Sequence, residues 1–189
     1  MTRIVAGEAG GRRLAVPPGD RTRPTSDRTR EALFGTLAAL VDLDGARVLD
    51  LYAGSGAVGL EALSRGAAAA LLVDAGARAA ATARANAEAL GLADRVTVRR
   101  DRVERVLAAG PAGPADAVDF VFADPPYALA DVDLDAVLAA LADRGWLAPG
   151  ALVVVERSSR GAGPVWPPSV RSEKQRRYGE ATLWYGRLS

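Results

Sequence analysis

The chain has 189 residues, of which 49% are hydrophobic and 25% are charged, and its formal net charge is +1. This length suits one domain with a full core, and no apolar stretch is long enough to span a membrane. The chain has neither cysteine nor histidine, which excludes disulfides, thiolate metal sites and the commonest metal ligand and general base. The start lacks the apolar segment of a signal peptide, so we expect a cytoplasmic protein without a metal centre.

Positive charge is concentrated at the two ends of the chain. Residues 1–30 hold seven arginines against three acids, and residues 157–189 hold seven basic residues against two acids. Residues 31–156 hold ten arginines and eighteen acids. Basic ends around an acidic body favour a polyanionic partner, although a solvated arginine-rich surface explains the same charges.

The first elements in chain order form an extension. Residues 3–6 and 12–16 predict a small β-hairpin across three glycines, and a stretch rich in proline, glycine and arginine follows at 17–24. Apolar positions at helical spacing predict a helix over residues 26–41, capped by Ser26 or Thr25. We therefore divide the chain into an extension, residues 1–24, and a main domain, residues 25–189.

The rest of the chain alternates between strand and helix signals. Short apolar runs predict strands at 46–50, 69–74, 95–99, 117–123 and 151–155, with helices between them at about 57–65, 76–90, 102–109 and 132–142. This alternation favours a parallel sheet covered by helices. Residues 169–178 and 181–188 are separated by Gly179-Glu180 and predict a hairpin, so the sheet should end with an antiparallel strand. Residues 147–150 are expected to form a turn.

The turn after the first core strand predicts a cofactor site. Residues 54–59 match G-x-G-x-x-G, which by itself indicates a dinucleotide. However, Asp50 lies at the strand end and would repel a pyrophosphate, whereas its carboxylate suits the ammonium group of S-adenosylmethionine. Asp74, at the end of the next strand, would bind ribose hydroxyls in either case.

Asp101 follows the third strand and has two possible roles. Its carboxylate could accept a hydrogen bond from the adenine amino group, or it could cap the helix that begins near Arg102. Both roles can coexist.

The strongest indication of the substrate is Asp124-Pro125-Pro126-Tyr127, which follows an apolar strand. Each proline fixes its own φ and restricts the residue before it, so the Asp124 carboxylate and the Tyr127 ring have little freedom. An acceptor beside a flat ring suits a planar group with an exocyclic amine. The alternative is a rigid strand exit whose tyrosine only packs.

These motifs resemble the class I adenosylmethionine-dependent methyltransferases that modify exocyclic amines. Three further segments, Arg3–Gly7, Arg23–Phe34 and Gly59–Ala67, make the chain similar to the RsmD family, the bacterial 16S rRNA (guanine(966)-N2)-methyltransferases. The resemblance covers nearly the full chain. One departure is that Asp74 stands where glutamate is more usual.

The resemblance implies an α/β, Rossmann-like, seven-stranded, mostly parallel sheet with an antiparallel last strand, plus an N-terminal β-hairpin. It implies methyl transfer from S-adenosylmethionine to guanine N2, with the target base flipped out of its stack. The catalytic segment would be Asp124, Pro125, Pro126 and Tyr127. The cofactor set would be Asp50, Tyr52, Ala53, Gly54, Ser55, Gly56, Asp74, Ala75, Asp101 and Arg102, with Arg23 and Thr25 closing over the ligand.

The resemblance also implies a partner, 16S rRNA in an assembling or assembled small ribosomal subunit, and a monomeric protein. The residues expected to contact RNA are Arg3, Arg12, Arg13, Arg28, Arg30, Lys174, Arg176, Arg177 and Tyr178. Three alternatives stay open. They are an amine methyltransferase of the same core acting on DNA adenine, another RNA base or a protein glutamine, a nicotinamide-dependent oxidoreductase, and a non-catalytic RNA-binding module.

Overall fold

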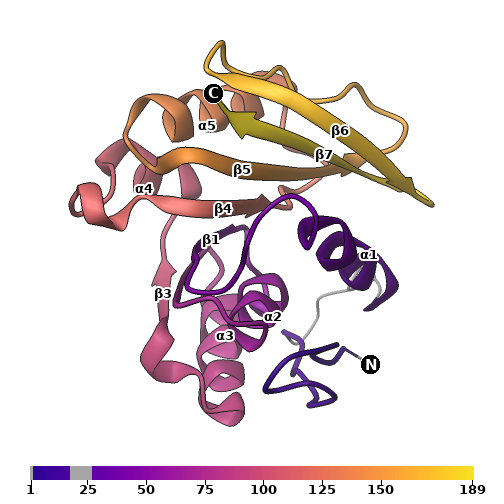
Figure 1. Cartoon of the computed structure of the whole chain (residues 1–189), viewed down its shortest axis with the longest axis vertical. Coiled ribbons are helices and arrows are strands. Elements are labelled where there is room, and N and C mark those ends of the chain that lie inside the picture. The colour runs from indigo at the N-terminus through magenta and orange to yellow at the C-terminus, as the bar shows by residue number, and fades with distance from the viewer. Residues whose placement is uncertain (1, 18–26) are drawn as a thin grey trace.

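The computed structural model of the chain describes residues 2–17 and 27–189, so the predictions on Arg23, Thr25 and Ser26 lie outside the described residues. A seven-stranded sheet in the order β3-β2-β1-β4-β5-β7-β6 forms the centre of the molecule (Figure 1). The strands are Arg47–Leu51 (β1), Ala69–Asp74 (β2), Val96–Arg100 (β3), Val118–Ala123 (β4), Leu147–Ser158 (β5), Val170–Tyr178 (β6) and Ala181–Leu188 (β7).

The strand directions confirm the predicted fold class. Strands β1 to β5 pair in parallel, and β7 runs antiparallel to both β5 and β6. The chain builds outward from β1 to β2 and β3, and then returns to place β4 on the other side of β1. In open α/β sheets, ligands bind outside the carboxyl ends of the strands at such a reversal of strand order. The carboxyl ends of β1 and β4 are therefore the expected place for a site.

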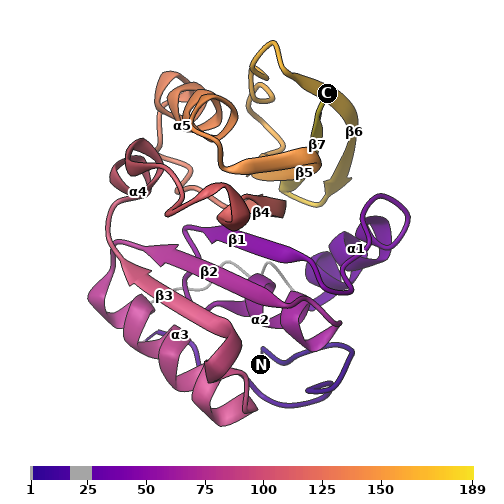
Figure 2. The ribbon, with the colours of Figure 1, turned by 60° about the vertical axis from the view of Figure 1, so that its left-hand side comes forward.

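Helices cover both faces of the sheet (Figure 2). They are Asp27–Leu37 (α1), Ala57–Ser64 (α2), Ala77–Leu90 (α3), Val103–Ala109 (α4) and Asp131–Asp143 (α5). One buried cluster joins the sheet to α1, α2 and α3, and a second joins it to α4 and α5. Along β1, Val48 belongs to the first cluster and Leu49 to the second, because successive strand side chains point to opposite faces. Within the described part of the chain, no helix has the length and apolarity needed to cross a membrane.

Most predicted boundaries lie within one residue of the structure, and two elements of the main domain, α1 and β5, differ by more. Helix α1 ends at Leu37 rather than at residue 41, and the Val41 N–H still donates to the Leu37 carbonyl at 2.9 Å in a final turn. The turn expected at 147–150 lies inside β5 as an irregularity, because the register with β4 jumps from Val118–Leu147 to Phe120–Leu152. Gly150 adopts φ 75° there, which explains why the turn signal was present within a strand.

The N-terminal arm, residues 2–17, contains the predicted hairpin. Arg3 and Arg13 form an antiparallel bridge, and the Ile4 N–H donates to the Arg12 carbonyl at 2.9 Å. The pairing is short, and most of the arm's fixation comes from the main domain instead.

Two buried side chains of α2 hold this arm. The Glu61 carboxylate, fully buried, accepts the N–H groups of Val5 at 2.7 Å and Ala6 at 3.0 Å. The Ser64 hydroxyl accepts the Ala9 N–H at 2.9 Å. The Glu61 charge is compensated by Arg65 at 2.8 Å and by the buried Arg30 at 3.5 Å. The arm is thus docked through satisfied polar groups rather than through an extended sheet.

Candidate active site

The turn between β1 and α2 adopts a backbone geometry that glycine permits. Gly54 and Gly56 have φ values of 56° and 78°, in the left-handed region that side chains rarely adopt. A Cβ on Gly56 would lie 2.8 Å from the Leu72 Cδ1, so packing also requires the absent side chain. Tyr52 is held at φ 59°, which is uncommon for a residue with a side chain and marks local strain. The backbone of 52–56 is therefore fixed in one conformation.

Asp50 lies below this turn and is almost fully buried, with 2% of its surface exposed. Its carboxylate accepts the Gly59 N–H of α2 at 2.9 Å. The pKa of the Asp50 carboxyl is raised to about 8, chiefly by burial and also by the charges of Asp124 and Asp74, while the hydrogen bond from Gly59 lowers it. A neighbouring cation would favour the ionised form of this carboxyl, and a neighbouring anion would disfavour it.

Asp74 ties together the loops that follow β1 and β2. One carboxylate oxygen accepts the Gly54 N–H at 2.9 Å, and the other accepts the Gly76 N–H at 2.8 Å. The side chain is only half-buried, and each carboxylate oxygen has a second acceptor position. Asp74 can therefore hold the glycine turn and bind a hydroxyl of a ligand at the same time. The exposed Ala75 lies next to it.

The segment Asp124–Tyr127 leaves β4 directly beside the end of β1. The Asp124 N–H points to the Leu51 carbonyl at 3.4 Å, and the Leu129 N–H donates to the Pro126 carbonyl at 2.9 Å. Pro125 is buried, whereas Asp124 and Tyr127 are half-buried. The structure thus brings the predicted catalytic segment to the same edge as the glycine turn.

Asp101 extends the same edge at the end of β3. Its N–H donates to the Asp74 carbonyl at 3.2 Å, and its carboxylate accepts the Arg102 N–H at 2.8 Å. Helix α4 begins at Val103 with Arg102 in the cap position and without a side-chain cap. The capping role considered for Asp101 is therefore wrong, because its carboxylate bonds a residue outside the helix. Its half-buried position beside Asp74 leaves the ligand role as a proposal.

The carboxylates at this edge indicate the charge of a fitting ligand. The charges of Asp124 and Asp74 both raise the pKa of the Asp50 carboxyl. A pyrophosphate here would add negative charge to an acidic, poorly solvated site. A ligand with an ammonium or sulfonium group and a ribose diol fits the donors and acceptors better, so the site suits S-adenosylmethionine.

Comparison with known proteins identifies the group to which this fold and site belong. The family described as Conserved hypothetical protein 95 matches residues 2–187. Ribosomal RNA small subunit methyltransferase D of Escherichia coli is 35% identical over 94% of this chain and 85% of its own length. The Haemophilus influenzae protein of the same name is 31% identical over 82% of this chain and 77% of its own. The chain belongs to the RsmD family.

The solved structures agree with this membership. The Escherichia coli protein yhhF superposes with a TM-score of 0.83 and 34% identity, covering 100% of this chain and 98% of its own. The fold of this RsmD-family chain is therefore that of the class I methyltransferases. The predicted fold and family are both confirmed.

The basic residues of this RsmD-family chain differ in how accessible they are. Arg3, Arg13, Arg28, Arg176 and Arg177 are exposed, whereas Lys174 and Tyr178 are half-buried. Arg12 is exposed but directs its guanidinium to the carbonyls of Ala89 and Leu90 at the end of α3. Arg30 is 2% exposed and pairs with Asp27 at 3.1 Å and with Glu61. The proposed RNA-contacting set therefore omits Arg12 and Arg30.

Two residues that the sequence did not single out reach the site loops. Asn86 of α3, 3% exposed, donates to the carbonyls of Ser55 and Ala15 at 3.0 Å and accepts the Ala15 N–H at 2.8 Å. It thereby joins the N-terminal arm to the glycine turn. Arg157 of β5 bonds the loop that follows Asp124. In the sequence, Asn86 is only a polar residue within a helical pattern, and Arg157 is only a polar residue after an apolar strand. Neither position predicts a role at the site.

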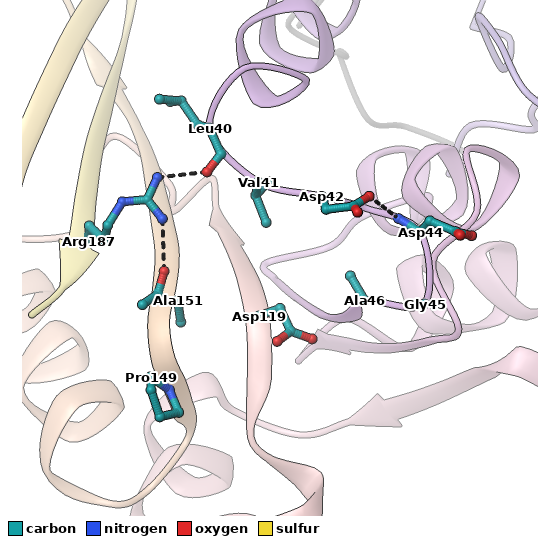
Figure 3. Close-up of a pocket in the computed structure, with 11 residues that line it drawn as sticks. Leu40, Val41, Asp42, Asp44, Gly45, Ala46, Asp119, Pro149, Ala151 and Arg187 are labelled. Carbon is teal, nitrogen blue, oxygen red and sulfur yellow. Dashed lines mark hydrogen bonds between the residues drawn. The ribbon is translucent and has the colours of Figure 1, made fainter.

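A cavity lies at the opposite, amino-terminal edge of the sheet (Figure 3). Its volume is about 410 Å³, and its lining includes Asp42 and Asp44 of the loop before β1 and Asp119 of β4. Arg187 closes one side by donating to the carbonyls of Leu40 at 2.7 Å and Gly150 at 2.9 Å. Across residues 2–17 and 27–189, no cluster of acidic side chains has the arrangement of a metal site.

Proposed function

We propose that this chain transfers a methyl group from S-adenosylmethionine to the exocyclic N2 of a guanine in small-subunit ribosomal RNA. One observation carries the proposal: the Asp124–Tyr127 segment is bonded to the end of β1, beside the glycine turn and the Asp50 and Asp74 carboxylates. Family membership supports rRNA as the substrate class, because the related proteins named above are rRNA methyltransferases.

Different groups of the proposed cofactor-binding residues would bind different parts of S-adenosylmethionine. Asp50 and the backbone of Ala53, Gly54, Ser55 and Gly56 lie where the amino-acid end would bind, beside Tyr52. Asp74 and Ala75 would hold the ribose, and Asp101 and Arg102 the adenine. When bound there, S-adenosylmethionine supplies an electrophilic methyl group on a sulfonium. Arg23 and Thr25 stay in the proposal as expected contacts outside the described residues.

The proposed catalytic segment acts on the base. The target guanine leaves its stack, because its amine is otherwise paired or inaccessible. The Asp124 carboxylate, or the carbonyl beside it, accepts a hydrogen bond from N2 and orients the nitrogen lone pair. Tyr127 stacks on the ring, which is worth about 1–3 kcal/mol by analogy with single-strand binding platforms. Pro125 and Pro126 keep both groups in place.

Proton transfer places little demand on the protein. The exocyclic nitrogen becomes acidic only after it has formed its bond to carbon, and water can then take the proton. This agrees with a chain that has no histidine. Most of the rate would come from holding the reacting atoms together and from excluding water.

The extension, residues 1–24, and the C-terminal hairpin would contact RNA phosphates. In the bridge between Arg3 and Arg13 the two residues lie opposite each other, so their side chains share one face of the arm. We expect the double variant Arg3→Gln, Arg13→Gln to lower the slope of log K against log salt by about 1.4–1.8. Filter binding at several salt concentrations measures this slope. Arg12→Gln is the matched control, because its guanidinium already bonds α3, and equal slopes for all three proteins would contradict the arm proposal.

The proposed activity is tested by incubating the protein with labelled S-adenosylmethionine and small ribosomal subunits that lack the modification. Label in the 16S rRNA is the expected result. Naked rRNA, duplex DNA and total cell protein serve as competing acceptors. Preferential labelling of DNA or protein would favour the alternative amine methyltransferases, and no label in any acceptor would favour a binding module.

A further inference from the structure

Arg157 at the end of β5 is a buried cation beneath the loop that carries the proposed catalytic segment. Only 8% of its surface is exposed. Its guanidinium donates to the Leu129 carbonyl at 3.0 Å and the Asp131 carboxylate at 2.9 Å, and reaches the Pro126 carbonyl at 3.4 Å. One side chain therefore contacts the segment itself, the loop after it and the first residue of α5.

The two prolines remove two backbone donors from this loop. Pro125 and Pro126 have no N–H, so neither can donate a backbone hydrogen bond. The loop's backbone bonds include the Leu129 N–H to the Pro126 carbonyl within it and the Asp124 N–H to the Leu51 carbonyl at its start. Arg157 adds bonds from outside the loop, to the Leu129 carbonyl and, as a second and longer contact, to the Pro126 carbonyl.

Arg157 is itself held by the rigid part of the molecule. It lies opposite Thr182 in the β5–β7 ladder, two positions beyond Val155, where the pairing of β5 with β4 ends. A guanidinium presents several N–H groups in one plane, so a single side chain can bond three acceptors at fixed positions. Arg157, a residue of the sheet, thus fixes the position of the loop 126–131 relative to the sheet.

The ion pair with Asp131 does not by itself account for this arrangement. The Asp131 side chain is 69% exposed, and exposed ion pairs contribute little to stability. The part-buried bonds to the two carbonyls are the specific part of the contact. They can be separated from the ion pair experimentally, because Asp131→Asn removes the charge and leaves the carbonyls unchanged.

We propose that Arg157 is a positioning residue that fixes the Asp124–Tyr127 segment in the conformation needed for methyl transfer. The proposal rests on the proposed function of that segment. It predicts that changes at Arg157 lower kcat and leave the binding of S-adenosylmethionine, at the β1–α2 turn, nearly unchanged. A displacement of about 1 Å in such a segment can lower a rate by about 100-fold.

The test uses Arg157→Lys, which keeps a cation but loses the planar fork, and Arg157→Gln, which loses the charge as well. We expect kcat to fall by about 10- to 100-fold in both, with the dissociation constant of S-adenosylmethionine changed by less than about twofold. Arg160→Gln is the matched control, because Arg160 is three positions along and pairs with Glu180 in solvent. Asp131→Asn should lower kcat by less than about threefold.

Hydrogen exchange gives a second measurement that does not depend on activity. The amides of residues 127–131 should exchange at least about tenfold faster in Arg157→Lys, with unchanged exchange in residues 50–60. Unchanged exchange at 127–131, or wild-type kcat in both Arg157 variants, would overturn the proposal. If Arg157→Gln fails to fold, Arg157→Lys decides the matter. Inactive wild-type protein with the expected exchange result would contradict the proposed function and leave the positioning role supported.

Discussion

The two edges of the sheet both collect carboxylates, but they hold them in different ways. At the carboxyl edge, Asp50 and Asp74 accept backbone N–H groups from the loops around a glycine turn, and Asp50 is buried. At the amino edge, Asp42 and Asp44 are exposed, and the contact between them is local, from the Asp44 N–H to the Asp42 carboxylate. Acidic residues therefore indicate a site only where strand ends and fixed backbone converge on them.

The largest expected effect comes from Asp124. Asp124→Ala removes the proposed acceptor for the target amine, and we expect transfer to fall by about 100- to 1000-fold with cofactor binding largely intact. Asp124→Asn retains an acceptor oxygen and should fall less. Single-turnover transfer and calorimetric titration of S-adenosylmethionine measure the two quantities. Full activity in Asp124→Ala would contradict the proposal that methyl transfer occurs at the carboxyl edge.

A smaller effect is expected at Asp74. Asp74→Asn keeps one acceptor oxygen but loses the charge and one of the two bonds to Gly54 and Gly76. We expect S-adenosylmethionine to bind about 10- to 100-fold more weakly, because hydrogen bonds to a charged group contribute about 1.5–3 kcal/mol. Titration calorimetry measures the affinity. Affinity equal to that of the wild type would mean that Asp74 only shapes the turn.

At the carboxyl edge, Asp50 should make the free energy of unfolding depend on pH. Its pKa is raised in the folded protein to about 8 from an ordinary 3.8, so the folded state binds a proton that the unfolded state releases between these values. The free energy of unfolding should therefore fall as pH rises from 5 to 8, by at most about 1.4 kcal/mol per pH unit from this group. The absence of histidine and cysteine keeps this window free of other side chains that ordinarily titrate in it.

Urea denaturation at pH 5, 6.5 and 8 measures this dependence, with Asp50→Asn as the comparison. The variant cannot ionise at this position but keeps an oxygen for the Gly59 N–H, so its stability should gain on that of the wild type as pH rises. Parallel pH profiles for the two proteins would show that the Asp50 carboxyl is ionised throughout.

The smallest effect is expected at the amino edge. Asp119 accepts the Arg47 N–H at 2.8 Å, and Asp119→Asn preserves an acceptor there. We expect a change in unfolding free energy below about 1 kcal/mol and no change in methyl transfer. Thermal unfolding and the transfer assay check both. A loss of transfer comparable to that of Asp124→Ala would contradict the separation of the two edges.

The elements of the carboxyl edge could be predicted from the sequence because each has a local signal, an apolar run followed by acids or glycines. The run 69–74 was predicted with the bounds that β2 has, and the acids and glycines that follow the strands had to meet at one edge of a parallel sheet. The bulge in β5 was harder to predict, because a Pro-Gly turn signal does not reveal that the strand pairs with β4 on both sides of it.

The supporting contacts could not be predicted in the same way. Glu61 and Asn86 lie in helical segments, where a charged or amide residue ordinarily faces solvent. They are buried because the N-terminal arm, distant in sequence, supplies their backbone partners. Arg157 follows an apolar strand and has acceptors from a loop whose path depends on the fold. Such partners follow from tertiary contact and have no periodic signal.

Identification of the modified nucleoside tests the central claim most directly. Small-subunit rRNA treated with the protein and labelled S-adenosylmethionine is digested to nucleosides and analysed by mass spectrometry. The account predicts N2-methylguanosine at a single nucleotide of 16S rRNA, formed by the wild type and lost in Asp124→Ala. A methyl group on adenine N6, or label in rRNA that persists in Asp124→Ala, would contradict it.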